Sequence, residues 1–150
     1  MAGNRNSQDS NYLSILLVED NLADARLIKE FLNEIISIKT ALHIVRDGKE
    51  AMEFLYLNCK YNNEHCSTFV ILDLNLPKMG GREVLKEIKG DDDLKRIPVV
   101  ILTTSTAEED IMECYNNHAN CYINKPLDFN EFSNVMNSIK SFWFNIAELP

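Results

Sequence analysis

The residues that could carry out chemistry follow short apolar segments of the sequence. Glu19 and Asp20 follow the first segment, and Asp73 follows the third. Thr103 follows the fourth segment, and Lys125 comes shortly after the fifth. If these segments are parallel β-strands, their carboxyl ends lie along one edge of a sheet. We therefore expect the carboxylates, the hydroxyl and the ammonium to meet at that edge.

Such a group of charges suits the transfer of a phosphoryl group. Two carboxylates about 4 Å apart repel each other by roughly 4 kcal/mol at an effective dielectric constant of about 20, so a fold would not gather them for stability. Mg²⁺ relieves this repulsion and prefers oxygen ligands. A carboxylate can also act as a nucleophile and form an acyl phosphate, which needs positioning and charge stabilisation. Mg²⁺, Lys125 and the Thr103 hydroxyl can each stabilise a phosphoryl oxygen, with Asp73 on the middle strand as the nucleophile.

The elements that must position these residues alternate between strand and helix patterns. Strands are predicted at residues 14–18, 41–45, 69–72, 98–102 and 121–123. Helices are predicted from residue 22 to about 34, 48 to about 57, 81 to 89, 108 to about 117, and from 128 onwards. Serial βα units with right-handed crossovers place helices on both faces of a parallel sheet. The sequence therefore predicts a doubly wound (βα)5 fold of the flavodoxin-like α/β type, with strand order 2-1-3-4-5.

Composition limits the domain organisation and the partners. The 150 residues fit one domain. We expect a disordered leader over residues 1–11 and the folded domain over residues 12–150. Residues 58–68 are expected to be an inserted loop or a ragged helix end on the rim of the sheet opposite the site. The net charge of −8 and the pI of about 4.8 argue against a nucleic-acid surface. No apolar run approaches the length of about 18 residues that indicates a membrane span. The 4 cysteines lack Cys-x-x-Cys spacing, which fits free thiols in the cytoplasm.

Four motifs in order resemble the response-regulator receiver domains of two-component signalling. They read Leu-Leu-Val-Glu19-Asp20-Asn, Ile-Leu-Asp73-Leu-Asn-Leu-Pro77-Lys-Met-Gly-Gly81, Pro98-Val-Val-Ile-Leu-Thr103-Thr-Ser and Tyr122-Ile-Asn-Lys125-Pro126. Asp73 and Thr103 are 103 − 73 = 30 positions apart, and Thr103 and Lys125 are 125 − 103 = 22 apart, which resembles the spacing in the family. The resemblance covers roughly residues 13–144. The sequence of the motifs is most similar to that of single-domain regulators of phytochrome-type histidine kinases.

The resemblance implies roles for the residues at the strand ends. It implies that Asp73 accepts a phosphoryl group from a sensor histidine kinase or a phosphotransfer protein. It also implies that Glu19, Asp20, Asp73 and the main-chain carbonyl of Asn75 hold Mg²⁺. Lys125 resembles the lysine that contacts the phosphoryl group, and we expect a cis bond between Lys125 and the following proline. On this interpretation the protein is a phosphoacceptor and not an enzyme, beyond its own phosphorylation and dephosphorylation.

Thr103 and Tyr122 resemble the switch pair of the family. We expect Tyr122 to be a half-buried aromatic residue in either state. On phosphorylation, Thr103 should turn towards the phosphoryl group and Tyr122 should swing inward from a projecting position. That motion would change the face formed by the fourth helix, the fifth strand and the fifth helix, where a downstream protein is expected to bind. A surplus of apolar residues in the C-terminal tail predicts a homodimer through the same face, with folding of the tail back onto its own domain as the alternative. These residues are Trp143, Phe144, Ile146 and Leu149.

Two other functions share parts of this pattern. Phosphatases of the haloacid-dehalogenase type also use an aspartate nucleophile at a strand end, with Mg²⁺, threonine and lysine. Their chemistry requires a second acid two residues after the nucleophile, where this sequence has Asn75. These phosphatases also carry a cap domain, which this sequence is not expected to form. A flavin carrier on the same fold needs a phosphate-binding loop after the first strand, where Glu19 and Asp20 would repel a phosphate. The receiver domain is therefore the predicted function.

Overall fold

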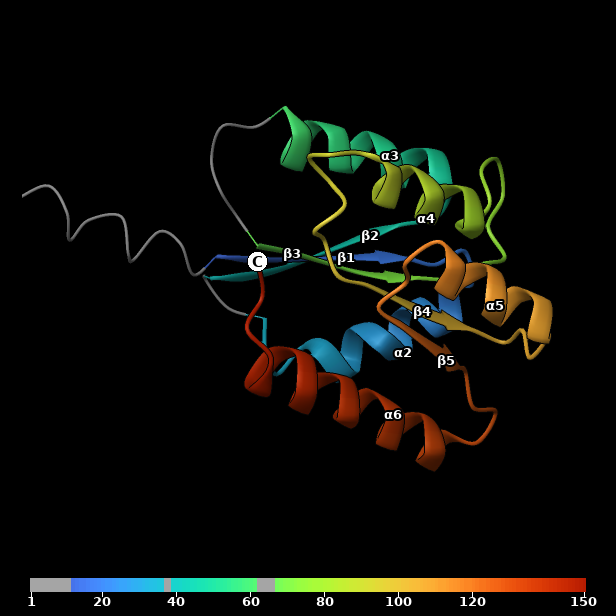
Figure 1. The fold of residues 1–150 in the computed structure, drawn as a ribbon. Helices are drawn as coiled ribbons and strands as arrows, with labels where there is room; N and C mark the ends of the chain where they lie inside the picture. The colour runs from blue at the N-terminus through green and yellow to red at the C-terminus, as the bar shows by residue number, and fades with distance from the viewer. Residues whose placement is uncertain (1–11, 37–38, 62–66) are drawn as a thin grey trace, which may run out of the picture.

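The computed structural model describes residues 12–36, 39–61 and 67–150, which form a parallel β-sheet with helices on both faces (Figure 1). The strands are β1 (Leu13–Val18), β2 (Thr40–Val45), β3 (Ser67–Leu72), β4 (Val99–Thr103) and β5 (Cys121–Asn124). They lie in the order β2-β1-β3-β4-β5, and each neighbouring pair is parallel. The predicted doubly wound α/β fold and its strand order are confirmed.

A helix follows each strand. The helices are α2 (Leu22–Leu32), α3 (Gly48–Leu55), α4 (Gly81–Gly90), α5 (Glu108–Asn116) and α6 (Phe129–Ser141), with π-helical turns η2 (Tyr56–Lys60) after α3 and η3 (Phe142–Ile146) after α6. Side-chain caps fix several helix starts, as where Asn21 Oδ1 accepts a hydrogen bond of 3.0 Å from the Asp24 N–H. The predicted boundaries hold to within a few residues, and η2 extends the helix into residues 58–60, where a loop or a ragged helix end was predicted.

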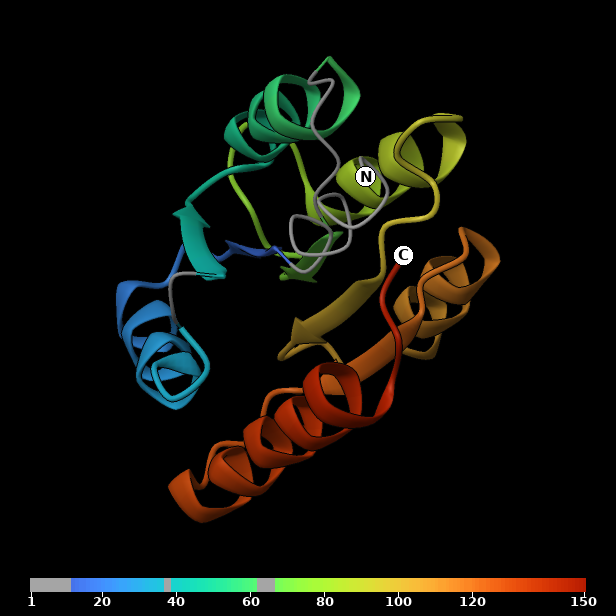
Figure 2. The same cartoon turned by 90° about the vertical axis from the view of Figure 1, so that its left-hand side faces the viewer.

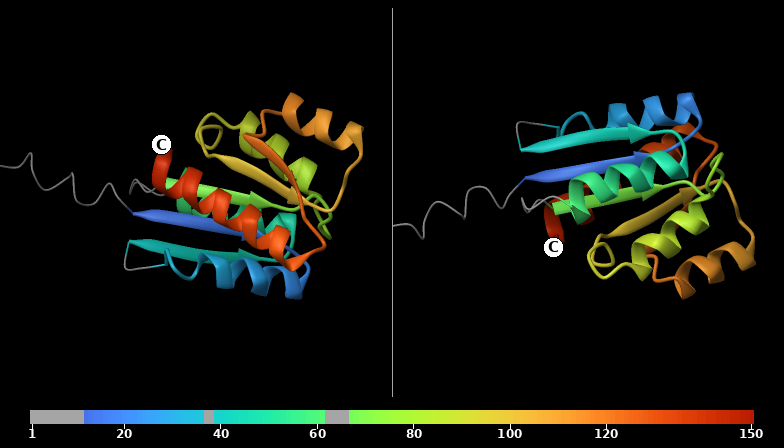
Figure 3. Two further views of the ribbon diagram at one scale, coloured as in Figure 1. Left: turned by 90° about the horizontal axis from the view of Figure 1, so that it is seen from below. Right: turned by 90° about the horizontal axis from the view of Figure 1, so that it is seen from above.

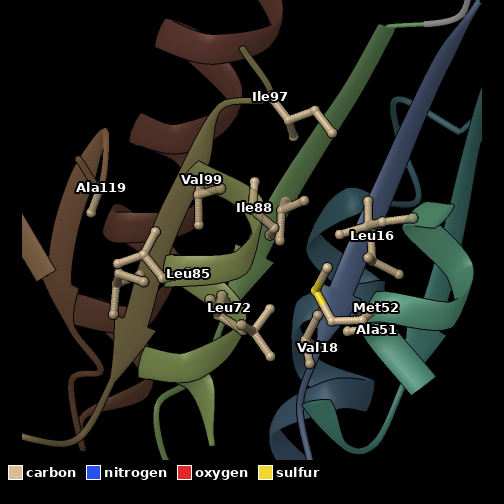
Figure 4. Packing of buried hydrophobic residues seen from close by; sticks show 14 of the residues in the cluster. Leu16, Val18, Ala51, Met52, Leu72, Leu85, Ile88, Ile97, Val99 and Ala119 are labelled. Carbon is tan, nitrogen blue, oxygen red and sulfur yellow. The ribbon is translucent and has the colours of Figure 1, made fainter. Parts of the chain in front are cut away.

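The sheet separates two hydrophobic clusters because alternate strand residues point to opposite faces. Leu16 and Val18 point towards α3 and α4 and pack there with residues such as Met52 and Leu85 (Figure 4). Ile15 and its counterparts on the other strands point towards α2 and α6. Figure 2 and Figure 3 show the two helical layers from further directions, with α5 beside β5. Since apolar side chains fill both faces, polar functional groups gather at the strand ends.

The C-terminal tail packs against its own domain. The Trp143 and Phe144 rings lie 5.3 and 4.9 Å from the Phe69 ring, measured between centroids. Figure 1 shows the C-terminus beside the starts of β1 and β3, which is the edge of the sheet opposite the strand ends. The tail therefore does not supply the surface beside the α5–β5–α6 face from which the homodimer was predicted, because Trp143 and Phe144 cover the core instead.

The start of α4 lies directly against the backbone of Asp73. A Cβ atom built on Gly81 would come within 2.1 Å of the Asp73 carbonyl oxygen and 2.7 Å of the Leu74 Cα atom. The Gly81 N–H in turn donates a 3.1 Å hydrogen bond to the carbonyl of Leu74. Glycine at position 81 thus lets a helix start in contact with the third strand end.

Some sequence predictions fall on parts of the chain outside the described residues. The leader predicted over residues 1–11 lies there, as do residues 62–66 of the predicted loop. Within the described ranges, residues 58–60 belong to η2 and residues 67–68 begin β3, at the end of that strand opposite Asp73. Within residues 12–36, 39–61 and 67–150, no helix has the length and apolar character needed to cross a membrane.

Candidate functional site

Neighbouring strands bring the carboxylates of Glu19 and Asp73 together. Val18 and Leu72 are paired at the ends of β1 and β3, so the next residue on each strand is an acid. The Asp73 N–H donates a 3.0 Å hydrogen bond to the Val18 carbonyl, which carries the ladder one step beyond the strand. Glu19 is 2% exposed and Asp73 is 7% exposed. Two acids buried this deeply need compensation by positive charge.

Lys125 supplies that compensation. Its Nζ atom forms ion pairs with Glu19 Oε1, with Asp73 Oδ2 at 3.1 Å and with Asp24 Oδ2 at 3.0 Å. The prediction of a cis bond after Lys125 is wrong, since no cis peptide bond occurs in the described ranges. A trans bond suffices here, because the Lys125 N–H bonds to the Thr103 carbonyl and the side chain reaches the crevice from that anchor.

The three buried charges alter one another's pKa values. Burial raises the pKa of Glu19 to about 7, although its hydrogen bond to Lys125 acts in the opposite direction. Burial also tends to raise the pKa of Asp73, but hydrogen bonding with Glu19 and the charge of Lys125 outweigh burial and lower that pKa. Burial tends to lower the pKa of Lys125, but Glu19 and Asp73 hold it above its ordinary value. At neutral pH the site therefore presents an ionised Asp73 beside an ammonium.

The remaining predicted site residues surround Asp73. Thr103 is fully buried at the end of β4, and hydrogen bonding from it helps to lower the pKa of Asp73. The Asn75 N–H donates a 3.3 Å hydrogen bond to Asp73 Oδ1, which holds the loop after β3 close to the carboxylate. Asp20 directly follows Glu19 in the sequence and is exposed. The structure thus brings Glu19, Asp73, Thr103 and Lys125 into one crevice.

The donor atoms suit a hard divalent cation, but Lys125 contacts the same oxygens. Glu19, Asp20, Asp73 and the Asn75 carbonyl offer only oxygen ligands, which is the donor set that Mg²⁺ prefers. In the part of the chain that the structure describes, no three acidic, histidine or cysteine side chains are already arranged around a metal position. The ammonium of Lys125 instead bonds to Glu19 and Asp73. A metal ion at this site would have to share these carboxylates with the lysine.

Tyr122 is half-buried, as predicted. Its ring packs against the cluster under α3 and α4, and its hydroxyl donates a 2.9 Å hydrogen bond to the Ser105 carbonyl. The projecting position from which the predicted switch starts is therefore not the one in this structure. The Ser105 N–H lies 3.4 Å from Thr103 Oγ1, so Ser105 connects the two residues of the predicted switch pair.

Sequence reasoning missed two groups of residues. Asp24, in the first turn of α2, contacts Lys125 although it follows no strand end. Its signal was an acid four residues after Asp20, one helical turn further on. The second group joins α5 to α4, since the Ser105 hydroxyl bonds to Asp110, which forms a 2.6 Å ion pair with Arg82. No local pattern predicts that contact between helices.

Comparison with known proteins places this geometry in a family. Residues 15–137 match the family described as response regulator receiver domain. The response regulator Rcp1 of Synechocystis sp. is 48% identical over 136 residues, which cover 91% of this chain and 92% of the relative. The probable methanogenesis regulatory protein FilR2 of Methanothrix harundinacea is 43% identical over 136 residues, which cover 91% of this chain and 86% of the relative.

Solved structures agree with this assignment. The Mn²⁺-bound form of response regulator Rcp1 has a TM-score of 0.82 and 47% identity, with 91% of this chain and 98% of that chain covered. The phosphorylated cyanobacterial phytochrome response regulator RcpA has a TM-score of 0.83 and 47% identity, with 93% and 99% covered. These findings do not support the phosphatase alternative. The chain belongs to the response regulator receiver domain family, and it is the receiver domain of a two-component response regulator.

Proposed function

We propose that the protein is a switch in which Asp73 accepts a phosphoryl group from a sensor histidine kinase or a phosphotransfer protein. The observation that carries this proposal is the buried, ionised carboxylate of Asp73, which Lys125 contacts at 3.1 Å at the carboxyl edge of the sheet. An oxygen of Asp73 forms the new bond to phosphorus as the bond from phosphorus to the donor histidine nitrogen breaks. The electron pair of that bond stays on the nitrogen.

Mg²⁺ is the proposed cofactor, and the relative Rcp1 binds the related ion Mn²⁺. The proposed ligands are Glu19, Asp20, Asp73 and the main-chain carbonyl of Asn75. When bound, the ion supplies positive charge to the phosphoryl oxygens and to the carboxylates. The burial of Glu19 beside Asp73 supports this proposal, because one ammonium shared among several acids leaves the site short of positive charge.

The other site residues stabilise the phosphoryl group and transmit its arrival. The Lys125 ammonium binds one phosphoryl oxygen and the Thr103 hydroxyl donates to another. Movement of Thr103 acts on Ser105 and, through the Ser105 carbonyl, on the hydroxyl of Tyr122. The resulting change on the α5–β5–α6 face alters binding of a downstream protein.

Receiver domains accept phosphoryl groups, and we propose that this one has no catalytic turnover beyond forming and hydrolysing its own acyl phosphate. A cytoplasmic location is supported by the free thiols of Cys114 and Cys121 among the described residues. The net charge of −8 supports protein partners over nucleic acid. A membrane partner is not proposed, since the charge would also repel an anionic lipid surface.

The test is labelling of Asp73 by a small phosphodonor such as acetyl phosphate in the presence of Mg²⁺. Wild type should become labelled, and chelation of Mg²⁺ should prevent labelling. Asp73→Asn keeps the shape of the side chain but removes the nucleophile, so it should stay unlabelled. Asp47→Asn is the matched control, because Asp47 is another buried carboxylate and asparagine keeps its role as the cap of α3. Equal labelling of Asp73→Asn and wild type would show that the site is wrong.

A homodimer through the α5–β5–α6 face is also proposed, now on different grounds. Apolar side chains on this side of the molecule are exposed, and Leu127 is 99% exposed. The others are Met112 and Tyr115, both on α5. Sedimentation of wild type and of Leu127→Glu, with Leu57→Glu as an exposed-leucine control on η2, tests the proposal. Wild type that sediments as a monomer at high micromolar concentration, with and without phosphorylation, contradicts it.

A further inference from the structure

We propose that Asp24 is a positioning residue that gives the Lys125 ammonium a partner outside the metal site and thereby raises the affinity for Mg²⁺. The inference rests on the proposed function, because it concerns the proposed Mg²⁺ site. Asp24 Oδ2 lies 3.0 Å from Lys125 Nζ, and the Asp24 side chain is 32% exposed, whereas that of Glu19 is 2% exposed.

The argument begins with competition between two cations. Lys125 has acidic partners in Glu19, Asp24 and Asp73. Two of them, Glu19 and Asp73, are also proposed ligands of Mg²⁺, so the ammonium and the metal ion compete for their oxygens. Asp24 belongs to the first turn of α2 and not to the proposed ligand set. When Mg²⁺ takes Glu19, Lys125 can keep Asp24 and Asp73 as partners, and the repulsion between the two cations is reduced.

The position of Asp24 on α2 favours this role over a purely helical one. Asp24 is an acid in the first turn, where a negative charge stabilises the helix dipole. The cap itself, however, uses the main-chain N–H of Asp24, which donates to Asn21 Oδ1. The carboxylate is therefore free to point at Lys125, which lies 101 positions further along the chain. A helix-capping role alone does not require that contact.

The first test is the affinity for Mg²⁺, measured calorimetrically on the full, unphosphorylated chain. Asp24→Asn should bind Mg²⁺ about tenfold more weakly than wild type, at the lower end of the effect of losing an outer-shell partner, because Asp24 is partly exposed. Glu131→Gln is the matched control, because Glu131 holds the same first-turn position in α6, after the cap Asp128. The control should bind Mg²⁺ as wild type does.

The second test shows whether Asp24 acts through the lysine. In a Lys125→Met background, Asp24→Asn should change the Mg²⁺ affinity no more than Glu131→Gln does, since there is no ammonium left to hold. If Asp24→Asn weakens Mg²⁺ binding equally in the presence and in the absence of the Lys125 ammonium, the inference is overturned and Asp24 acts only through its general charge.

Phosphoryl labelling separates failure of the inference from failure of the proposed function. Wild type that binds no Mg²⁺ and takes no label overturns the proposed function, and the inference with it. Wild type that binds Mg²⁺ and becomes labelled, together with Asp24→Asn of the same affinity, overturns the inference alone.

Discussion

The main-chain N–H of Lys125 donates a 2.7 Å hydrogen bond to the main-chain carbonyl of Thr103. β5 ends at Asn124, so this bond joins the first residue beyond β5 to the last residue of β4. It keeps the ammonium and the hydroxyl on neighbouring strand ends without using either side chain. Substitution of the Lys125 side chain should therefore change the charge of the site and leave the backbone in place.

Lys125→Met should destabilise the protein when Mg²⁺ is absent. The substitution leaves Glu19 and Asp73 buried without their cation, which lowers the free energy of unfolding by about 2–4 kcal/mol. This loss lies near the lower end for a broken buried ion pair, because Glu19 can bind a proton. Added Mg²⁺ should restore part of this loss. Urea unfolding with chelator and with Mg²⁺ measures both effects. Lys86→Met, which removes an exposed ammonium, should change stability by less than about 0.5 kcal/mol. A loss from Lys125→Met that is equal in both buffers contradicts the assignment.

The affinity for Mg²⁺ should rise with pH through neutrality. Burial raises the pKa of Glu19 to about 7, and the metal needs the carboxylate, so binding releases a proton below that pH. Between pH 8 and pH 6 the affinity should fall about tenfold, as expected for one group that must ionise. Calorimetry in two buffers of different ionisation enthalpy measures the released proton. Glu19→Gln should bind more weakly and lose this pH dependence, and a flat profile for wild type would refute the prediction.

The same pKa values predict opposite effects on the stability of the metal-free protein. Glu19 has a raised pKa in the folded state, so its contribution is present below its ordinary pKa of 4.5 and is lost as the pH rises to about 7. Asp73 has a lowered pKa, so its contribution is present above 3.8 and is lost as the pH falls further. Urea unfolding of Glu19→Gln and wild type across pH 5 to 8 should show the Glu19 slope in wild type alone.

Gly81→Ala should destabilise the protein, whereas Gly90→Ala should not. The new Cβ at position 81 would meet the Asp73 carbonyl oxygen at 2.1 Å, so α4 or the third strand end has to move. We expect a loss of about 1–3 kcal/mol, which is typical of overpacking, together with slower phosphoryl labelling. Gly90 is the last residue of the same helix and has no atom within 4 Å of the corresponding position. Alanine there should be neutral or stabilising by up to about 1 kcal/mol, and urea unfolding of both variants makes the comparison.

Tyr122→Phe should separate the packing of the ring from its hydrogen bond. The ring stays in place, but the hydroxyl that donates to the Ser105 carbonyl is lost, at a cost of about 0.5–1.5 kcal/mol. Tyr115→Phe is the control, since the hydroxyl of Tyr115 is in an exposed contact with the Tyr122 N–H and should matter less. Phosphorylation should still occur in Tyr122→Phe, but binding of a downstream protein should respond to it less. An unchanged response would exclude Tyr122 from the switch.

The strand ends were predictable from sequence because each depends on local signals. Continuous apolar segments indicate the strands, and the rule that ligands bind at the carboxyl ends of parallel strands predicts that Glu19, Asp73, Thr103 and Lys125 lie together. The spacing of Asp24 one helical turn after Asp20 indicates that it lies near the site, but its contact with Lys125 depends on how far the lysine reaches across the crevice. The rotamer of Tyr122 likewise follows from the position of the Ser105 carbonyl.

The tail shows a different limit of sequence reasoning. A surplus of apolar residues after Phe142 indicates that something must cover them, but it cannot say whether the cover is a partner or the chain itself. In the structure η3 turns Trp143 and Phe144 towards Phe69. Apolar residues in the tail do pack against other apolar side chains. The path of the chain after α6 places Trp143 and Phe144 on their own domain and not against a partner.

The position of Trp143 has a practical consequence for spectroscopy. It is the only tryptophan in the sequence, and its ring packs 5.3 Å from the Phe69 ring at the amino end of the sheet. Phe69 lies in β3 and precedes Asp73, which directly follows that strand, by 73 − 69 = 4 residues, which corresponds to about 13 Å along an extended chain. The intrinsic fluorescence of this indole should therefore change strongly when the tail detaches or the protein unfolds. Occupancy of the acidic crevice should leave the emission nearly unchanged, so the natural fluorophore reports the integrity of the fold independently of signalling.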